Sequence, residues 1–180
     1  MAVASYDWFT SVSETIGGWD SWSNITNTLT GTSTYAYIGL TSGLVSKQLR
    51  MDGPISGGSV PLDAQFSNIA IEVVARHANT SSPGAGYTFE EVSIGNNLQK
   101  SMVIDTFKTE HVFSGDLAYW GITNSEVFEF INAASGWDFR IACDNNGEGL
   151  NNGLIRIYSI KAEFTYTTPT EDDIMNVIYL

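Results

Sequence analysis

The segment from Ile69 to Arg76 limits the fold of this chain more than any other, because its residues alternate in character position by position. One face carries Ile69, Ile71, Val73 and Ala75, and the other carries Ala70, Glu72, Val74 and Arg76. A period of two is the spacing of a β-strand with one buried face. Pro61 has no backbone N–H and suits the approach to a strand, so we expect this strand to begin after Ala64.

Similar patterns recur along the chain and predict several further strands. In the last one, at 154–167, Ile160, Ala162, Phe164 and Tyr166 share a face, and the length of this segment favours a central position in a sheet. Other strands are expected at 33–43, 44–51, 87–95, 101–115 and 137–143. The pattern therefore predicts a chain made mostly of short strands with turns between them.

A single helix is expected at 122–136, with Thr123 or Asn124 as its N-cap, Glu126 in its first turn and Gly136 after its end. The fold class predicted is all-β: an antiparallel jelly-roll-like β-sandwich with one short helix and extended N- and C-terminal arms. The expected divisions are an N-terminal arm at 1–30, a β-sandwich domain at 31–167 and a C-terminal arm at 168–180.

The charge of the chain argues against nucleic acid as a partner, because the chain has 20 acidic residues and only 8 Lys and Arg, and its formal net charge is −12. This acidity fits either simple solubility or a match to a basic protein surface. Cys143 is the only cysteine, so no internal disulfide can form, and two histidines supply no zinc-ligand spacing. No apolar run reaches 18 residues, and no Lys or Arg precedes Lys47, so we expect neither a membrane span nor a signal peptide.

Few residues suggest catalysis or metal binding. Asp144, Asn146 and Glu148 alternate as in a calcium loop, but the Asn-Gly pairs around them favour an ordinary hairpin turn. His111 lies near Asp116 and could act as a base, yet no nucleophile motif accompanies it, which favours a structural histidine. We therefore expect no enzyme, no cofactor and no metal, although a polysaccharide hydrolase stays open as an unsupported alternative.

Two terminal segments are the candidates for binding a partner. Trp8, Trp19 and Trp22 lie in a region without clear periodicity, and tryptophan is a frequent interface anchor. The tail beyond Pro169 contains the apolar residues Ile174, Val177, Ile178 and Tyr179. This tail either folds back onto its own domain or docks on a neighbouring chain by strand addition.

Several short motifs follow one another along most of the chain. They are Trp22 with Asn24 and "TNTL" from Thr26, Tyr35-Ala36, Val60-Pro61 with Ala64 and "IAIEV" from Ile69, "GDLAYWG" at 115–121, and a last strand of the form "IxSIxAxxTY". Their order resembles that in a group of bacteriophage-associated β-sandwich proteins, and the resemblance covers about Trp22 to Tyr166. Its motifs consist of turn and core residues, so they speak for fold and origin more than for function.

The resemblance implies a virion structural protein, and we expect a capsid decoration or cement protein that stabilises the assembled head shell. Its partners would be the lattice of the major capsid protein and further copies of itself, with a trimer favoured, and not a membrane or nucleic acid. It would be synthesised in the host cytoplasm and would lie on the head surface of the virion. The alternative is a carbohydrate- or receptor-binding β-sandwich module of a tail or fibre.

Overall fold

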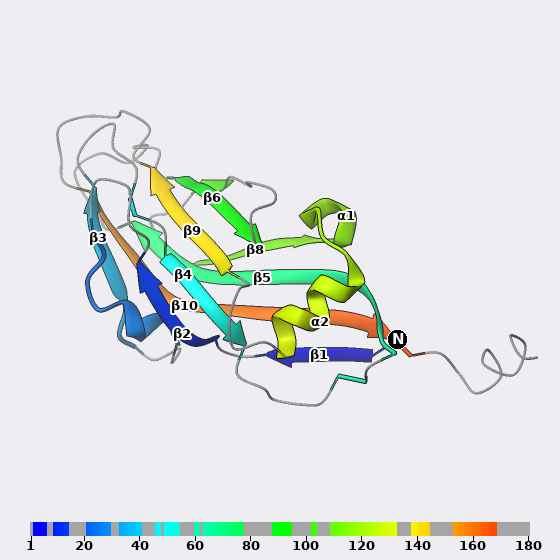
Figure 1. Cartoon of the computed structure of the whole chain (residues 1–180). Coiled ribbons are helices and arrows are strands. Elements are labelled where there is room, and N and C mark those ends of the chain that lie inside the picture. The colour runs from blue at the N-terminus through cyan, green and yellow to red at the C-terminus, as the bar shows by residue number, and fades with distance from the viewer. Residues whose placement is uncertain are drawn as a thin grey trace, which may run out of the picture.

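In the computed structural model, the chain forms two antiparallel β-sheets with short helices beside them (Figure 1). One sheet, sheet A, has the strand order β1-β10-β5-β8, with β3 also paired to β10, and the other, sheet B, has the order β2-β4-β9-β6-β7. The all-β class predicted from the sequence is confirmed. The structure describes residues 2–6, 9–14, 21–29, 33–40, 46–47, 49–54, 60–61, 63–77, 88–94, 102–103, 109–132, 138–144 and 153–168.

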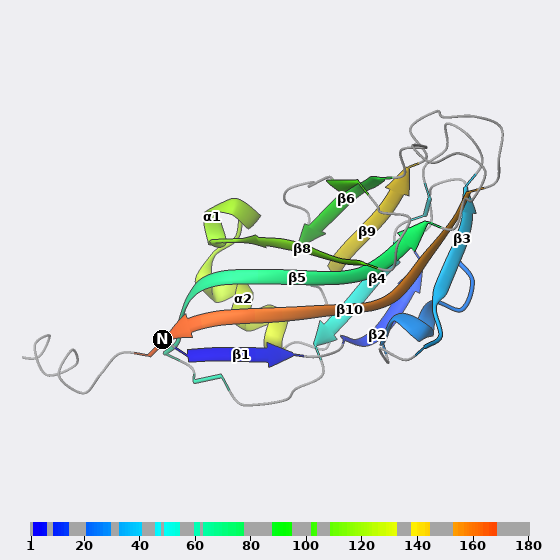
Figure 2. The same ribbon diagram turned by 180° about the vertical axis from the view of Figure 1, so that it is seen from behind.

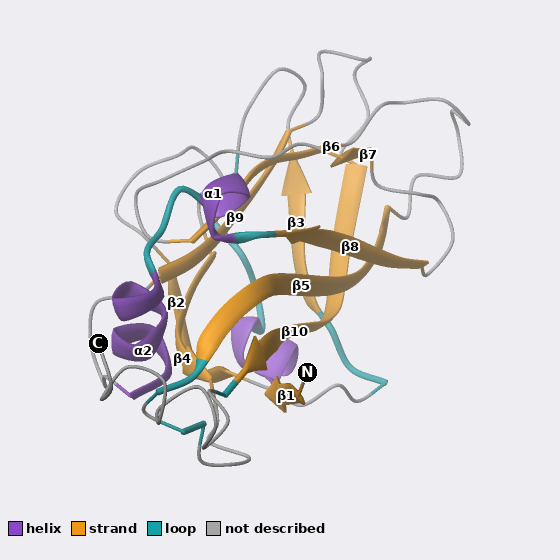
Figure 3. Ribbon diagram, turned by 90° about the vertical axis from the view of Figure 1, so that its right-hand side faces the viewer, coloured by secondary structure: helices purple, strands orange, loops and turns teal. Residues whose placement is uncertain are grey.

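Each sheet contains five strands, and the helices are short. Sheet A consists of β1 (Ala2–Tyr6), β3 (Ala36–Leu40), β5 (Gln65–His77), β8 (Thr109–Gly115) and β10 (Gly153–Thr167). Sheet B consists of β2 (Phe9–Glu14), β4 (Leu49–Pro54), β6 (Thr88–Ile94), β7 (Met102–Val103) and β9 (Asp138–Asp144). The helical elements are the 3₁₀ helix η1 (Ile25–Leu29) and the α-helices α1 (Leu117–Trp120) and α2 (Asn124–Asn132). Figure 3 shows α1 and α2 on the same side of the molecule.

The two longest strands, β5 and β10, lie side by side at the centre of sheet A (Figure 2). β5 begins at Gln65, as the sequence predicts, and the face predicted to be buried is fully buried. β10 is central, as predicted from its length, because β5 pairs along one edge while β3 and β1 pair with successive parts of the other. Alternation thus identified both the central strands and their inward faces.

Two β-bulges keep these central strands facing the core along their whole length. Between Ile157 and Ser159 the register shifts, so that Tyr158 and Ser159 together stand opposite Val74. The buried positions of β10 change there from odd to even numbers, with Ile157 and Ile160 both fully buried. A second shift leaves Ser67 as the extra residue of β5. An extra residue reverses the alternation of side chains, which the sequence pattern of a single strand does not reveal.

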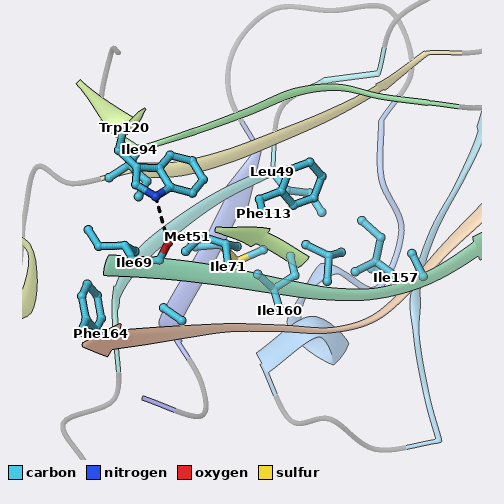
Figure 4. Packing of buried hydrophobic residues seen from close by; sticks show 14 of the residues in the cluster. Leu49, Met51, Ile69, Ile71, Ile94, Phe113, Trp120, Ile157, Ile160 and Phe164 are labelled. Atoms are coloured by element: carbon cyan, nitrogen blue, oxygen red, sulfur yellow. Dashed lines mark hydrogen bonds between the residues drawn. The ribbon is translucent and has the colours of Figure 1, made fainter. Parts of the chain in front are cut away.

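Both sheets contribute to one buried hydrophobic cluster (Figure 4). Leu49 and Met51 of β4 and Ile94 of β6 belong to the same cluster as Ile71 of β5 and Phe164 of β10. All five side chains have essentially no exposed surface. Burial of this kind stabilises a fold by roughly 1.5–3 kcal/mol for each large apolar side chain.

Helix α1, which the sequence did not predict, carries Trp120 into this cluster. Its indole Nε1 donates a hydrogen bond of 3.0 Å to the carbonyl oxygen of Ile69, and the side chain is completely buried. The helix stops at Gly121, whose φ of 69° is readily adopted only by glycine. Ile122 N–H then donates to the carbonyl oxygen of Leu117 at 3.0 Å, which closes a Schellman turn.

Helix α2 starts where the sequence predicts, with Thr123 as the N-cap. The Thr123 N–H and Oγ1–H both donate to Oε2 of Glu126 at 2.7 Å, which forms a capping box. Asn124, the other cap candidate, has a different role, because its Oδ1 accepts from Phe66 N–H at 2.8 Å and its Nδ2 donates to the carbonyl oxygen of Ala64 at 3.0 Å. Asn124 therefore attaches α2 to the start of β5.

Two expectations about the strands and arms are corrected. The described part of residues 1–30 is not an arm, since β1 pairs with β10, β2 pairs with β4 and Trp22 is buried. The strand expected at 101–115 is divided into β7 of sheet B and β8 of sheet A. The C-terminal arm expected at 168–180 lies outside the described residues except for Thr168.

Replacement of Asn124 by alanine should lower the free energy of unfolding by about 2–3 kcal/mol, because two part-buried backbone groups lose their partner. Chemical denaturation followed by circular dichroism measures this change. Ser125→Ala in the same turn is the control and should change stability by less than ~0.5 kcal/mol, because Ser125 is exposed. Equal effects of the two substitutions would contradict the role assigned to Asn124.

The Glu126 cap predicts a pH dependence of stability. Hydrogen bonds from the Thr123 side chain and then its backbone N–H lower the pKa of the Glu126 carboxyl group below 4.5. The stabilisation is therefore fully present above pH 4.5 and is lost as the pH falls through the lower pKa of the folded state. The stability difference between the wild type and Glu126→Gln, measured by denaturation at a series of pH values, should shrink in that window. A stability difference that stays constant down to the lowest pH would show that the stabilisation does not come from hydrogen bonds to the ionised Glu126 carboxylate.

Candidate functional site

Trp22, predicted to bind a partner, is instead a core residue. Its side chain is only 6% exposed, and its Nε1 donates a hydrogen bond of 2.8 Å to the carbonyl oxygen of Lys47. Its backbone N–H donates to Oε1 of Glu14, whose other oxygen lies 3.9 Å from Lys47 Nζ. The Trp22 indole, which was expected to bind a partner, therefore packs and forms its hydrogen bond within the domain.

The other partner-binding candidates, Trp8, Trp19, Ile174, Val177, Ile178 and Tyr179, lie outside the described residues. Their assignment to a partner interface stays a prediction.

The residues considered for catalysis or calcium binding are part of the fold where the structure describes them. His111 stands opposite Val73 on the buried face of sheet A, and its side chain is 5% exposed. Asp116 caps α1, since its Oδ1 accepts a hydrogen bond of 2.7 Å from Tyr119 N–H. Asp144 ends β9, while Asn146 and Glu148 are outside the described part of the chain.

Within the part of the chain that the structure describes, no three His, Cys, Asp or Glu side chains gather as metal ligands. None of the described helices is long and apolar enough to cross a membrane.

The pairing of the strands reveals a feature that sequence reasoning missed. All four arginines of the chain stand in two cross-strand pairs, Arg76 opposite Arg156 in sheet A and Arg50 opposite Arg140 in sheet B. Like charges directly opposite each other in a sheet destabilise it. In a chain with a net charge of −12, the Arg76–Arg156 pair calls for an explanation beyond the fold.

The Arg76–Arg156 pair lies on the outer face of sheet A, because Ala75, Ile155 and Ile157 beside it face the core. Both Nε atoms are buried without a hydrogen-bond partner, and no described acidic residue forms an ion pair with either side chain. Lys161 on the same face differs, since its Nζ lies 3.3 Å from Oε1 of Glu72. The two guanidinium groups therefore leave positive charge available at one end of the sheet.

Three tyrosines surround this pair and complete what we call the arginine–tyrosine cluster: Arg76, Arg156, Tyr35, Tyr37 and Tyr158. The guanidinium carbon of Arg156 lies 4.6 Å from the centre of the Tyr35 ring, which is a cation–π contact. Tyr35 also makes edge contacts with Tyr37 and Tyr158, with ring centres 6.1 and 5.4 Å away. The Tyr35 ring thus packs on Arg156, and the other two rings pack on Tyr35.

The arginine–tyrosine cluster has the chemistry of an anion site. A guanidinium group is planar and always charged, and it binds a carboxylate or phosphate through two parallel hydrogen bonds. Partial burial strengthens such bonds because the local dielectric constant is lower than that of water. Only the register between β5 and β10 places Arg76 and Arg156 together, so no local sequence motif could have shown the site.

A second surface feature is the outer edge of β8. Among the described strands, β8 pairs only with β5, so its other edge carries no described partner. Val112 in the middle of β8 is 44% exposed and is the one large hydrophobic residue exposed in the described part of the chain. An open strand edge with an apolar side chain is suited to pairing with another chain.

Comparison of the chain with protein-family models and with curated proteins finds no match. The arginine–tyrosine cluster and the β8 edge are the surface features of the described chain that suggest a function.

Replacement of Arg76 by glutamine should raise the free energy of unfolding by ~0.2–1 kcal/mol at low salt, because it removes the repulsion across β5 and β10. The gain should shrink as salt is added, since screening weakens the repulsion in the wild type. Denaturation of dilute protein at two salt concentrations measures both effects.

Lys161→Gln is the matched control, because it removes one positive charge from the same face but breaks the pair with Glu72. It should leave stability unchanged or lower it slightly. If Arg76→Gln is the more destabilising of the two, Arg76 is a structural residue and the cluster is not a binding site.

Proposed function

We propose that this chain is a structural protein of a bacteriophage virion, most specifically a capsid decoration or cement protein with a jelly-roll-like β-sandwich. Such a protein binds the assembled head shell and not the free subunits, so it stabilises the shell as a ligand stabilises the state that it binds. It acts as an oligomer, with a trimer favoured, on the lattice of the major capsid protein at the head surface. It carries out no catalysis.

The open edge of β8 is the observation that carries this proposal. The edge offers backbone groups along seven residues and the exposed side chain of Val112. An extended segment of a neighbouring subunit can add there as a further strand, which is a common way to join proteins in an assembly. Natural proteins usually protect such an edge, and no described strand of this chain does so for β8, so a strand from a neighbouring subunit would supply that protection.

The positions of the phage-like motifs support the same origin. Ala64 and the "IAIEV" motif mark the approach to β5 and its buried face, and "GDLAYWG" spans the end of β8, α1 and its C-terminal turn. Asn124 and Trp120 tie these two motifs together through hydrogen bonds to Ala64 and Ile69. Two of the motifs that resemble the phage proteins therefore meet at one structural junction.

A carbohydrate- or receptor-binding module of a tail or fibre is the second candidate. Tyr35 and Tyr37 favour it, because both rings are partly exposed beside Arg156 on the outer face of sheet A. Aromatic rings next to polar groups are suited to stacking against a sugar. A tail or fibre component is present in far fewer copies than a component of the head lattice.

The first test is the copy number of this chain in purified virions relative to the major capsid protein, measured by quantitative mass spectrometry. We expect hundreds of copies for a lattice-wide decoration protein. A handful would favour the tail or fibre module, and absence would exclude a virion component.

The same measurement on two variants tests the β8 edge. Val112→Lys should fold normally, because Val112 is exposed, but should reduce the number of copies on the head by about tenfold, since a lysine discourages strand addition at an edge. Gln65→Lys adds the same charge at an exposed position on β5 and should leave the copy number unchanged. Equal occupancy of both variants would exclude the β8 edge as the contact.

A further inference from the structure

We propose that the Arg76–Arg156 pair binds the carboxylates of the acidic segment Glu171–Asp173 of a neighbouring copy of this chain. This inference deepens the proposed function and rests on it for the role of the oligomer. The contact itself is argued from the cluster, the charge of the chain and the length of its tail.

The hydrogen-bond donors of this contact belong to the arginine–tyrosine cluster. Arg76 and Arg156 stand opposite each other across β5 and β10 and together carry several N–H donors, and both Nε atoms are buried without an acceptor. The Tyr35 ring at 4.6 Å fixes Arg156 and reduces the entropy lost when an anion binds. The ligand that satisfies these donors and offsets the repulsion between the two charges is a group with more than one carboxylate.

The hydrogen-bond acceptors, which are carboxylates, belong to the tail of the chain. Glu171, Asp172 and Asp173 form the only run of three consecutive acids in the sequence, and the apolar segment 174–180 follows at once. Three adjacent carboxylates repel one another in the absence of a cation, just as the two arginines do in the absence of an anion. The two features are therefore complementary in charge and multivalency.

The length of the chain favours a contact between different copies. Gly153–Thr167 forms β10, so Arg156 and Thr167 are eleven residues apart in the strand and at most about 36 Å apart in space, since twist and the bulge at Tyr158 shorten a strand. From Thr167 to Asp173 the main chain can extend by at most about 21 Å. An aspartate side chain, an arginine side chain and the hydrogen bond between them span nearly the remaining ~15 Å. A tail would therefore have to fold back and extend almost fully to meet the arginine pair of its own domain, whereas the tail of a neighbouring copy needs no such extension.

A contact of this kind is directional, because the tail of one copy meets the cluster of the next. Repeated around a rotation axis, such contacts close into a ring, which agrees with the trimer favoured for the proposed function. The contact also explains how copies with a net charge of −12 associate, since each tail places its acids on a positive site.

The test measures the oligomeric mass of the full-length chain by analytical ultracentrifugation over a range of concentrations. The variant Arg76→Gln/Arg156→Gln and the variant Glu171→Gln/Asp172→Asn/Asp173→Asn should each weaken self-association by about tenfold or more. Salt should weaken the wild type and have little further effect on either variant. Circular dichroism confirms that both variants fold.

Mixing the two variants provides a readout that a structural defect would not give. One variant keeps an intact tail and the other keeps an intact arginine pair, so together they can form one productive contact. The mixture should form one-to-one dimers, while each variant alone should be mostly monomeric at the same concentration. Dimers that contain both variants, identified by native mass spectrometry, would support the exchange of tails.

Two single variants serve as controls. Lys161→Gln removes a cation of the same face that is already paired with Glu72, and it should leave self-association unchanged. Glu148→Gln removes an acid that precedes β10 by a few residues, and it should also have no effect. Stronger association of Glu148→Gln would mean that Glu148 occupies the arginine pair of its own domain, and loss of association would assign the contact between copies to Glu148 instead of the tail.

Several results would overturn the inference. A wild type that is monomeric at all concentrations would exclude exchange of tails, as would full association of both charge variants. Loss of association in the arginine variant alone would assign the site to other carboxylates. Binding of a uronic-acid oligosaccharide by the wild type but not by the arginine variant, without oligomers, would assign it to an acidic glycan. None of these results depends on the copy number in virions, so the proposed function can stand or fail separately.

Discussion

The pairing of β5 with β10 is the constraint on which the rest of the structure depends. Their ladder extends from Ile155 opposite His77 to Thr167 opposite Gln65. Every other strand of sheet A attaches to one of these two strands. The partners are separated by roughly eighty to one hundred residues in the sequence, so the ladder forms only after a large loop has closed. Strand formation in sheet A is therefore tied to a contact that no local segment can supply, which favours cooperative folding.

The helical segment after β8 secures this ladder at one end. The buried Trp120 side chain donates a hydrogen bond to the carbonyl oxygen of Ile69, and Asn124 forms hydrogen bonds with backbone groups of Phe66 and Ala64. These bonds lie on both sides of the bulge at Ser67, where the ladder itself is irregular. Side chains of the helices thus replace the strand partners that a regular sheet would provide.

The sequence predicted those features that a single segment determines. The buried faces of β5 and β10 and the start of α2 follow from alternation and from capping, both of which are local. Helix α1 was missed because four residues show no helical period, and β1 and β2 were missed because five and six residues are too short to establish a clear alternation.

The surface site could not be predicted in the same way. The Arg76–Arg156 pair depends on the register between distant strands. The burial of Trp22 depends on Lys47 and Glu14, which are distant from it in the sequence. The residue type suggested that this tryptophan lies in a partner interface, whereas tertiary packing buries it in the core.

The bulge at Tyr158 also restricts how this protein can change in evolution. Loss of one residue from the middle of β10 would move Arg156 from the outer face towards the core or shift Ile160 outwards, since side chains alternate at every step. Substitutions on the outer face leave the register intact. Related chains should therefore differ freely in loop length and in surface charge while they keep the number of residues in β10 constant.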